Sequence, residues 1–346
     1  MRTSIGISLM LMLGIYTHVA AATADTTLKN GIPFRLGAAV KIRQLKEDKA
    51  YREALISEFT SITPENAMKF SALHPSPQVY KWDDADYIVS FAEKNNIRIH
   101  GHTLLWPKSN PDWVKNFIGD STAWEGMLKD HITTVVKHFK GKVASWDVVN
   151  EAMGDNGKLK NTIWLQHLGP GYIARCFQYA HSADPQAILF YNDYGHEYST
   201  VRRRAIIKMA MDLQKKGIPI GGLGLQMHTK LRISDKKVQI AIKEVAATGL
   251  QIHLSELEIT VGHGLPSTFM LSDSLSAAQA LKYKMIFKAY SLIPPGQQFG
   301  ITTWAVGDKD SFRNGSLKNH EYPVLFDMKY RPKASLKAVK EIFTPH

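Results

Sequence analysis

The sequence contains almost no cysteine: Cys176 is the single one in 346 residues. A disulfide within the chain is therefore excluded, and the folded state must be stabilised by its packed core. Cys176 lies in a helix-like stretch, where we expect a buried small hydrophobic residue rather than a reactive thiol. With 44% hydrophobic residues, the chain has enough apolar side chains for one large core.

The sequence also lacks basic stretches interleaved with aromatic residues, which are typical of nucleic-acid binding. Its net charge is +12, but the lysines and arginines are scattered along the chain. The densest run, residues 202–204, is interpreted as part of a solvated basic face. We therefore expect no nucleic-acid partner, and binding to another polyanion remains the alternative.

No span-length apolar run marks the start of the chain. Residues 5–16 are apolar, follow a short basic start and precede small residues, but they are too few to cross a membrane. This three-part pattern predicts a signal peptide over residues 1–24, with the cleavage site at residues 22–24. We expect a secreted or periplasmic protein with no membrane anchor, a monomer, whose single mature domain covers residues 25–346.

Internal repeats and linkers are absent too, and short β-rich runs alternate with longer amphipathic stretches. This alternation is typical of βα units around a parallel sheet. The expected strands cover residues 34–40, 58–63, 97–102, 143–150, 187–192, 222–227, 251–256 and 298–304, and the expected helices include 84–95, 124–139, 172–182, 200–216, 236–248 and 276–292. Because no glycine-rich phosphate turn follows the first strand, the pattern favours an α/β fold of the (β/α)8 TIM barrel type in a single domain.

Two glutamates, Glu151 and Glu256, are placed at the ends of expected strands. Cleavage of a glycosidic bond needs two carboxyl groups, one to protonate the leaving oxygen and one to meet the oxocarbenium-like carbon. Asn150, directly before Glu151, fits this chemistry because its amide can hold a sugar hydroxyl. A single strand-end glutamate is more often a solvated acid, so the surrounding residues must decide.

Polar or aromatic residues follow seven of the eight expected strands. In a (β/α)8 barrel, the active site is built where the carboxyl ends of the strands meet. The residues in question are Glu65, Asn66, Lys69, His102, Trp106, Asn150, Glu151, Asn192, Asp193, Gln226, His228, Glu256 and Trp304. Together they predict one site that binds and cleaves a sugar chain.

Several short motifs resemble those of glycoside hydrolase family 10, whose members are mostly endo-β-1,4-xylanases. The motifs are TPENAMK at 63–69, GHTLLW at 101–106, WDVVNE at 146–151, YNDY at 191–194, GLQMH at 224–228 and, with one change, SELEI at 255–259. The resemblance covers essentially residues 34–327. It implies a retaining endo-β-1,4-xylanase that acts on xylan and uses no metal and no organic cofactor.

The resemblance also implies roles for single residues, with Glu151 as the acid/base and Glu256 as the nucleophile. Retention requires the two carboxyl groups roughly 5–5.5 Å apart, and an acid must hold a proton, so we expect a raised pKa for Glu151. His228 would orient Glu256, while Gln226 and Asn192 would position the acid/base side. The expected substrate contacts are Glu65, Asn66, Lys69, His102, Trp106, Asn192, Trp304 and Phe312, and the expected catalytic support is Asn150, Gln226, His228 and Glu258.

Three positions depart from the family pattern. Glu258 stands where an aspartate usually completes the network with the histidine, and its extra methylene puts the support of His228 in question. Residues 107–109 read PKS where a histidine and a glutamine are common, and Phe312 replaces a second tryptophan. These departures leave open a β-1,4-glucanase or a xylo-oligosaccharide hydrolase of the same fold, and a sugar-binding barrel without catalysis. The pattern at residues 65–69 favours xylan.

Overall fold

The computed structural model describes residues 27–262, 264–314 and 321–344, and the expected signal peptide lies outside these ranges. Its strands are β1 (Arg35–Val40), β2 (Ser61–Pro64), β3 (Arg98–Leu105), β4 (Ser145–Asn150), β5 (Ile188–Asp193), β6 (Gly222–Leu225), β7 (His228–Lys230), β8 (Gln251–Thr260) and β9 (Gln298–Thr303). Neighbouring strands are parallel, and the pairings of β1 with β9 and of β6 with β8 close eight of them into a barrel. The predicted (β/α)8 barrel is confirmed, with β7 added along the outer half of β8.

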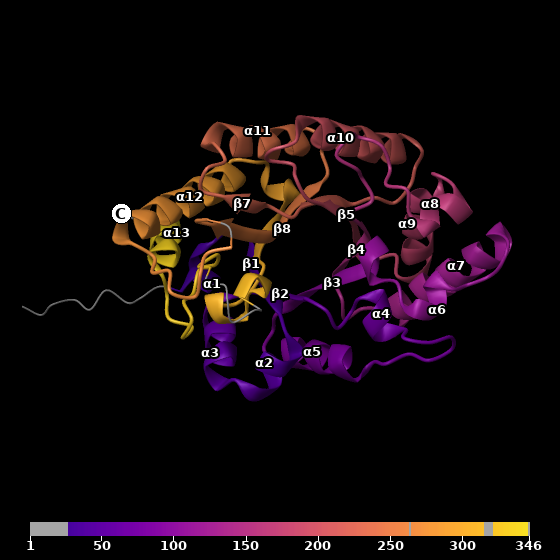
Figure 1. The fold of residues 1–346 in the computed structure, drawn as a ribbon, viewed down its shortest axis with the longest axis horizontal. Coiled ribbons are helices and arrows are strands. Elements are labelled where there is room, and N and C mark those ends of the chain that lie inside the picture. The colour runs from indigo at the N-terminus through magenta and orange to yellow at the C-terminus, as the bar shows by residue number, and fades with distance from the viewer. Residues whose placement is uncertain (1–26, 263, 315–320, 345–346) are drawn as a thin grey trace, which may run out of the picture.

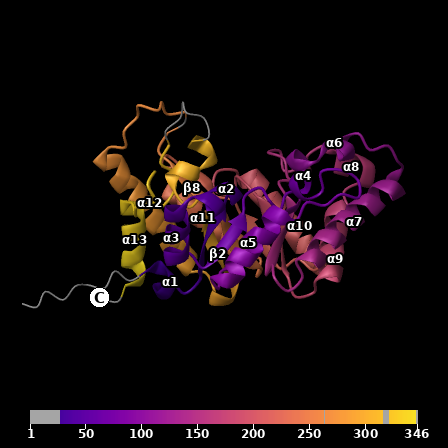
Figure 2. The ribbon, with the colours of Figure 1, turned by 90° about the horizontal axis from the view of Figure 1, so that it is seen from below.

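Helices surround the barrel, as Figure 1 shows. They are α1 (Leu28–Gly31), α2 (Ile42–Glu47), α3 (Lys49–Glu58), α4 (Phe70–Leu73), α5 (Asp83–Lys94), α6 (Asp112–Lys115), α7 (Ser121–His138), α8 (Ile163–Leu168), α9 (Tyr172–Ala183), α10 (Thr200–Lys215), α11 (Asp235–Ala246), α12 (Asp273–Ser291) and α13 (Ala334–Phe343). In Figure 2, α12 and α13 lie at one end of the molecule and α7 to α9 at the other. No helix in the described ranges is long and apolar enough to cross a membrane.

Local sequence explains where these helices begin and which face they bury. Side chains at the N-caps of α7, α10, α11 and α12 accept a backbone N–H of the first turn, which stabilises each helix start. In α9, Ile173, Cys176, Phe177 and Ala180 recur at a spacing of three or four and are buried against the core. Cys176 is thus the buried residue that its sequence context predicted, and burial raises the pKa of its thiol.

The barrel interior below the site contains polar groups that pair with one another. His100 Nε2 lies 3.0 Å from Asp147 Oδ1, and His253 Nε2 lies 2.7 Å from Thr302 Oγ1. The two histidine rings meet edge to face, with their centroids 4.7 Å apart. Because buried polar groups are costly unless they are paired, these contacts fix the layer on which the site rests.

The structure shifts most of the predicted element boundaries by one to four residues. Helix α3 continues to Glu58, where a strand was expected to begin, because the Glu58 carboxylate accepts the Leu28 N–H at 2.8 Å and pairs with Lys340 at 2.9 Å. Strand β3 continues to Leu105, beyond the predicted end at residue 102. The sixth expected strand breaks at Met227, whose φ is 60°. Strand β8 continues past Glu256 to Thr260, since β7 pairs with its outer half.

The prediction that residues 202–204 form a solvated basic face is wrong for two of the three arginines. Arg202 is buried, with its guanidinium 2.6 Å from Asp155 and 3.5 Å from Asp193. Arg203 is buried as well and pairs with Glu244 at 2.7 Å. Both arginines therefore connect α10 to neighbouring segments, and Arg204 remains exposed.

Candidate active site

The two predicted catalytic glutamates lie at the same mouth of the barrel, and both are buried. Glu151 directly follows β4 and is 8% exposed, while Glu256 lies within β8 and is 4% exposed. The backbone N–H of Glu151 donates to the Asn192 carbonyl at 2.9 Å, and that of Glu256 donates to the Gln226 carbonyl at 3.0 Å. Glu151 has a φ of 58°, a left-handed conformation that non-glycine residues adopt at a cost and keep mainly at functional sites.

A chain of amide hydrogen bonds connects the two carboxyl groups. The Asn192 Nδ2 group donates to Glu256 Oε1 at 2.8 Å and to Asn150 Oδ1 at 3.0 Å. The Gln226 Nε2 group donates to the same Asn150 oxygen at 3.2 Å and to Glu151 Oε1 at 3.4 Å. This path crosses β4, β5, β6 and β8, so the four strands hold both acids in a fixed relation.

A glycine in β6 gives Asn192 the space for this arrangement. A Cβ atom at Gly224 would lie 2.2 Å from Asn192 Oδ1, which is impossible without displacing the amide. The Ser255 hydroxyl donates to the same oxygen at 2.6 Å and so fixes which way the amide faces. Asn192 is completely buried and contacts Asn150 and Glu256, and the substrate contact expected for it from the sequence stays a prediction.

His228 bridges Glu256 and Glu258. Its Nε2 lies 2.9 Å from Glu256 Oε2, and its Nδ1 lies 2.6 Å from Glu258 Oε1. Burial acts to lower the pKa of His228, but the two carboxylates outweigh it and raise this pKa to about 10. At neutral pH the imidazolium therefore donates to both acids, and the longer side chain of Glu258 reaches the histidine.

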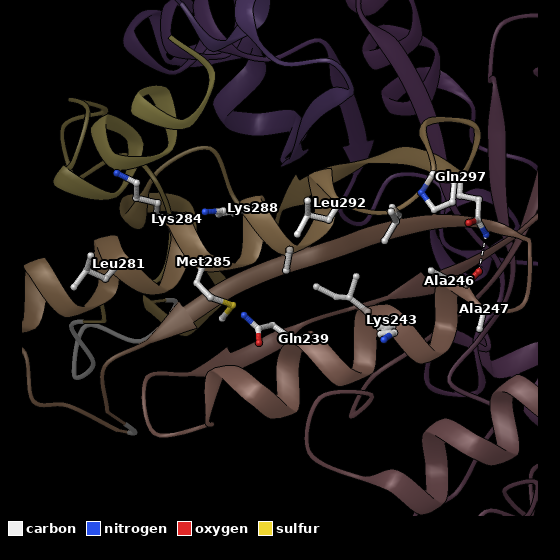
Figure 3. A pocket seen from close by; sticks show the side chains of 14 residues that line it. Gln239, Lys243, Ala246, Ala247, Leu281, Lys284, Met285, Lys288, Leu292 and Gln297 are labelled. Carbon is white, nitrogen blue, oxygen red and sulfur yellow. Dashed lines mark hydrogen bonds between the residues drawn. The ribbon is translucent and has the colours of Figure 1, made fainter. Parts of the chain in front are cut away.

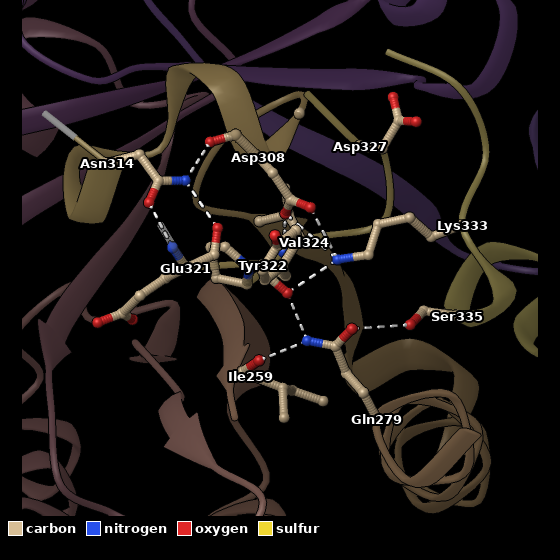
Figure 4. A network of polar contacts seen from close by, with 12 residues as sticks. Ile259, Gln279, Asp308, Asn314, Glu321, Tyr322, Val324, Asp327, Lys333 and Ser335 are labelled. Carbon is tan, nitrogen blue, oxygen red and sulfur yellow. Dashed lines mark hydrogen bonds and ion pairs between the residues drawn. The ribbon is translucent and has the colours of Figure 1, made fainter. Parts of the chain in front are cut away.

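Arg313 is the part of this network that sequence reasoning missed. Its Nε donates to Glu258 Oε1 at 2.8 Å, and its Nη2 donates to the same oxygen. The side chain of the next residue, Asn314, donates to the carbonyls of Asp308 and Glu321, both at 2.7 Å, as Figure 4 shows. Lys333 Nζ in turn lies 3.0 Å from Asp308 Oδ2, so the segment that carries Arg313 is anchored to the start of α13.

The protonated state of His228 leads to a prediction about stability. Because the pKa of His228 is higher in the folded state than its value of about 6.5 in the unfolded state, protonation of His228 stabilises the fold. This stabilisation is complete below about pH 6.5. That contribution is lost as the pH rises through about 10. We expect Glu258→Gln to be less stable than the unmodified protein near pH 6 and the gap in free energy of unfolding to narrow toward pH 10. Urea unfolding at several pH values measures this gap, and a gap that does not change with pH contradicts the bridge.

The surroundings of Glu151 differ from the prediction of a raised pKa. Lys108 Nζ lies 3.2 Å and Lys160 Nζ 3.8 Å from Glu151 Oε2. Burial acts to raise the pKa of Glu151, but the two lysines outweigh it, so this pKa lies below its ordinary value. The prediction is therefore wrong for the free protein, because its sequence basis did not include the two cations.

On the β2 side of the mouth, several expected substrate contacts come together. Lys69 Nζ donates to Asn66 Oδ1 at 2.9 Å and lies 4.8 Å from the centroid of the Trp106 ring. Glu65 is buried, and its carboxylate pairs with Lys41 Nζ at 3.6 Å. Burial raises the pKa of Glu65 and lowers that of Lys69. Lys41, which directly follows β1, was not singled out from the sequence.

The remaining expected contacts, His102, Trp304 and Phe312, line the mouth at different depths. His102 is buried, lies 2.8 Å from Asp147 through its Nδ1, and meets the Trp304 ring edge to face at 5.2 Å. Trp304, directly after β9, is buried as well. Phe312 is 46% exposed, and its ring centroid lies 5.9 Å from that of His228. His102 thus supports Trp304 from below, and Phe312 forms an outer edge.

A separate groove of about 970 Å³ lies on the outside of the barrel, between α11 and α12. Figure 3 shows Leu281, Met285 and Leu292 along it, with Lys284 and Lys288 beside them. None of the residues that line it belongs to the site described above. In the part of the chain that the structure describes, no cluster of three or more His, Cys, Asp or Glu residues is arranged to hold a metal ion.

Fold and site together define a class of protein. A (β/α)8 barrel that holds two carboxyl groups at the carboxyl ends of its strands is an arrangement that glycoside hydrolases use. Residues 24–342 match the sequence model of "Glycosyl hydrolase family 10". The chain belongs to this family and is a glycoside hydrolase.

Similar proteins include several xylanases. The chain is 34% identical over 338 residues to endo-1,4-beta-xylanase B of Thermotoga neapolitana, and the match covers 96% of both chains. The crystal structure of xylanase 10B from Thermotoga petrophila RKU-1, in complex with xylobiose, has a TM-score of 0.83 at 35% identity, covering 90% of this chain and 94% of that one. Exoglucanase XynX of Acetivibrio thermocellus is 33% identical, and the match covers 91% of this chain but 30% of that longer protein.

Proposed function

We propose that this protein is an endo-β-1,4-xylanase that cleaves internal bonds of xylan with retention of the anomeric configuration. The observation that carries the proposal is the chain of amide hydrogen bonds between Glu151 and Glu256, completed by the His228 bridge to Glu256. It provides one acid held by the amides and one carboxylate oriented by Asn192 and His228. Family membership and the similar xylanases support the choice of substrate.

In the first step, Glu256 attacks the anomeric carbon while Glu151 gives its proton to the leaving glycosidic oxygen. One C–O bond forms, one breaks, and the leaving sugar departs as a neutral alcohol. Asn192 donates to one oxygen of Glu256 and His228 to the other, so the carboxylate is oriented before the substrate binds. Such preorganisation avoids the cost of rearranging polar groups during the reaction.

In the second step, Glu151 removes a proton from water, which attacks the glycosyl–Glu256 ester and frees the carboxylate. Lys108 and Lys160 stabilise the carboxylate form of Glu151, which is the form that this step needs. The first step needs the protonated form, so the two lysines oppose it. Activity should therefore fall on the alkaline side as Glu151 ionises.

The alternative is a β-1,4-glucanase or a hydrolase of short xylo-oligosaccharides with the same mechanism. Phe312 is the specific reason to consider it, because this exposed ring is smaller than the tryptophan common in the family and leaves more space near His228. The motif that contains Glu65, Asn66 and Lys69 supports xylan, because it resembles the family whose members are mostly xylanases.

Product analysis on xylan and cellulose, side by side, tests the proposal. We expect a range of xylo-oligosaccharides from xylan and far less product from cellulose, with Glu256→Ala as the inactive control. Release mainly from cellulose would establish the glucanase instead. Activity confined to short oligosaccharides would contradict internal cleavage, and no product from any substrate would indicate a sugar-binding barrel.

We further propose that the protein is exported and acts as a monomer without a membrane anchor. The pattern over residues 1–24 supports export, and a polymeric substrate such as xylan is met outside the cytoplasm. Fractionation of expressing cells, with amino-terminal sequencing of the product, tests the export. Light scattering after gel filtration tests the monomer, for which a mass near 38.8 kDa less the signal peptide is expected.

A further inference from the structure

Two lysines share one oxygen of the acid/base. The Oε2 atom of Glu151 is fully covered, and Lys108 and Lys160 approach it at 3.2 and 3.8 Å. The Lys108 side chain is 67% exposed and the Lys160 side chain 26% exposed, so neither side chain is fully buried. The single negative charge of the Glu151 carboxylate faces the positive charges of two lysines. These three groups therefore have a net positive charge.

The two lysines reach Glu151 from different segments of the chain. Lys108 belongs to the short helix η1 (Pro107–Ser109) after β3, and Lys160 lies between β4 and α8. Lys160 Nζ lies 4.9 Å from the ring centroid of Tyr194, which follows β5. Lys108 Nζ lies 5.6 Å from the centroid of the Trp106 ring, and Lys69 Nζ lies 4.8 Å from the same centroid, so Lys108 also neighbours the β2 side. In the proposed reaction Glu151 gives its proton to the leaving oxygen, so lysines that flank its carboxyl group lie next to the place of the leaving sugar.

The proposed reaction changes the charge at this place. Glu151 must be protonated to act as an acid, and its two lysines then lose their only carboxylate partner among the described residues. An anionic group on the leaving part of the substrate would replace that partner. A carboxylate is suited to this place, because a charge-assisted hydrogen bond to an ammonium group is stronger than one between neutral groups.

We propose that Lys108 and Lys160 form a site for a carboxylate that the polysaccharide carries as a side group, so that a uronic-acid-substituted xylan is the preferred substrate. The inference rests on the proposed function and adds the chemical class of the substrate. The overall charge of +12 is consistent with attraction to an acidic polymer.

A bound carboxylate also changes the working pH range. Three lysines act on the charge of Glu151: Lys108 from η1, Lys160 from the segment after β4, and Lys69 after β2. Glu256 in β8 is connected to Glu151 through the chain of amide hydrogen bonds. A substrate carboxylate neutralises part of the field of Lys108 and Lys160. Glu151 then keeps its proton to a higher pH. Activity should therefore begin to fall at a higher pH on an acidic oligosaccharide than on a neutral one.

The test compares kcat/KM across pH for a linear xylo-oligosaccharide and for the same oligosaccharide with one glucuronic acid side group. For the unmodified protein, we expect the acidic substrate to be preferred about threefold to tenfold at low salt, since Lys108 is largely exposed and screened. The preference should shrink at high salt. In Lys108→Met, the ratio of kcat/KM for the acidic to that for the neutral oligosaccharide should fall toward one. The alkaline limbs of the two pH profiles should then coincide.

Controls make each outcome decisive. Lys115→Met removes an exposed lysine of α6 that pairs with Asp112 instead, and it should keep the preference. If Lys108→Met or Lys160→Met has too little activity, calorimetric binding of both oligosaccharides to each lysine variant combined with Glu256→Ala supplies the ratio. An unchanged ratio in both lysine variants, or no preference in the unmodified protein, overturns the carboxylate site and leaves the xylanase proposal intact. Failure to hydrolyse either oligosaccharide refutes the proposed function itself.

Discussion

Glu256→Ala is expected to reduce kcat on xylan by at least about 10⁴-fold, as removal of a catalytic nucleophile typically does. No other carboxylate in the described part of the chain occupies the place held by Asn192 and His228. Binding of xylo-oligosaccharides should survive, because the cluster around Glu65, Asn66 and Lys69 is untouched. Steady-state kinetics and calorimetry on the same preparation measure the two quantities.

A matched control and a chemical rescue sharpen this experiment. Glu53→Ala removes an exposed carboxylate of α3, far along the chain from the site, and should leave turnover unchanged. Azide is small enough to enter the space that the Glu256 carboxylate leaves, so it should attack an activated aryl xyloside and give the α-glycosyl azide. Wild-type-like turnover of Glu256→Ala, or a β-azide, would exclude Glu256 as the nucleophile.

Glu151→Ala is expected to lose about 10³- to 10⁴-fold on xylan, within the range by which general acids accelerate reactions. Oxygen leaving groups of sugars are poor and need the proton that Glu151 supplies. An aryl xyloside with an activated phenol needs little protonation, so its first step should be affected far less. Equal losses on both substrates would refute the acid role.

The same variant reports on the second step. Without Glu151 no base activates water, so the glycosyl–enzyme ester should accumulate on the activated substrate and show as a burst of phenol. Azide needs no base and should release the sugar as the β-glycosyl azide. Glu151→Gln is the matched control for packing, because it keeps the contacts of the side chain while removing the carboxylate.

Much of the fold could be predicted because the signals are local and repeated. Each βα unit has its own apolar run and its own amphipathic helix, and α9 illustrates how a spacing of three or four marks a buried face. Placing the site also needed a single rule, since strands of a parallel barrel deliver their carboxyl ends to one mouth. Glu151, Glu256 and His228 are therefore brought together as expected.

The remaining features depend on contacts between distant segments, which a linear pattern does not contain. Arg313 reaches Glu258 from a segment after β9 and holds the oxygen of Glu258 that also contacts His228. Lys108, from the segment after β3, and Lys160 approach Glu151 and together reverse the expected direction of its pKa shift. Arg202 looked like a surface residue, because a run of arginines does not reveal the acidic partners that bury it.

The most direct test of the mechanism is the configuration of the first sugar released from xylo-oligosaccharides. Proton NMR spectra recorded within the first minutes of hydrolysis distinguish the two anomers before they interconvert. Double displacement through Glu256 predicts that the β anomer is formed first and that the α anomer grows in later. Initial formation of the α anomer would mean that water attacks directly, and it would contradict the assignment of Glu256 as a nucleophile.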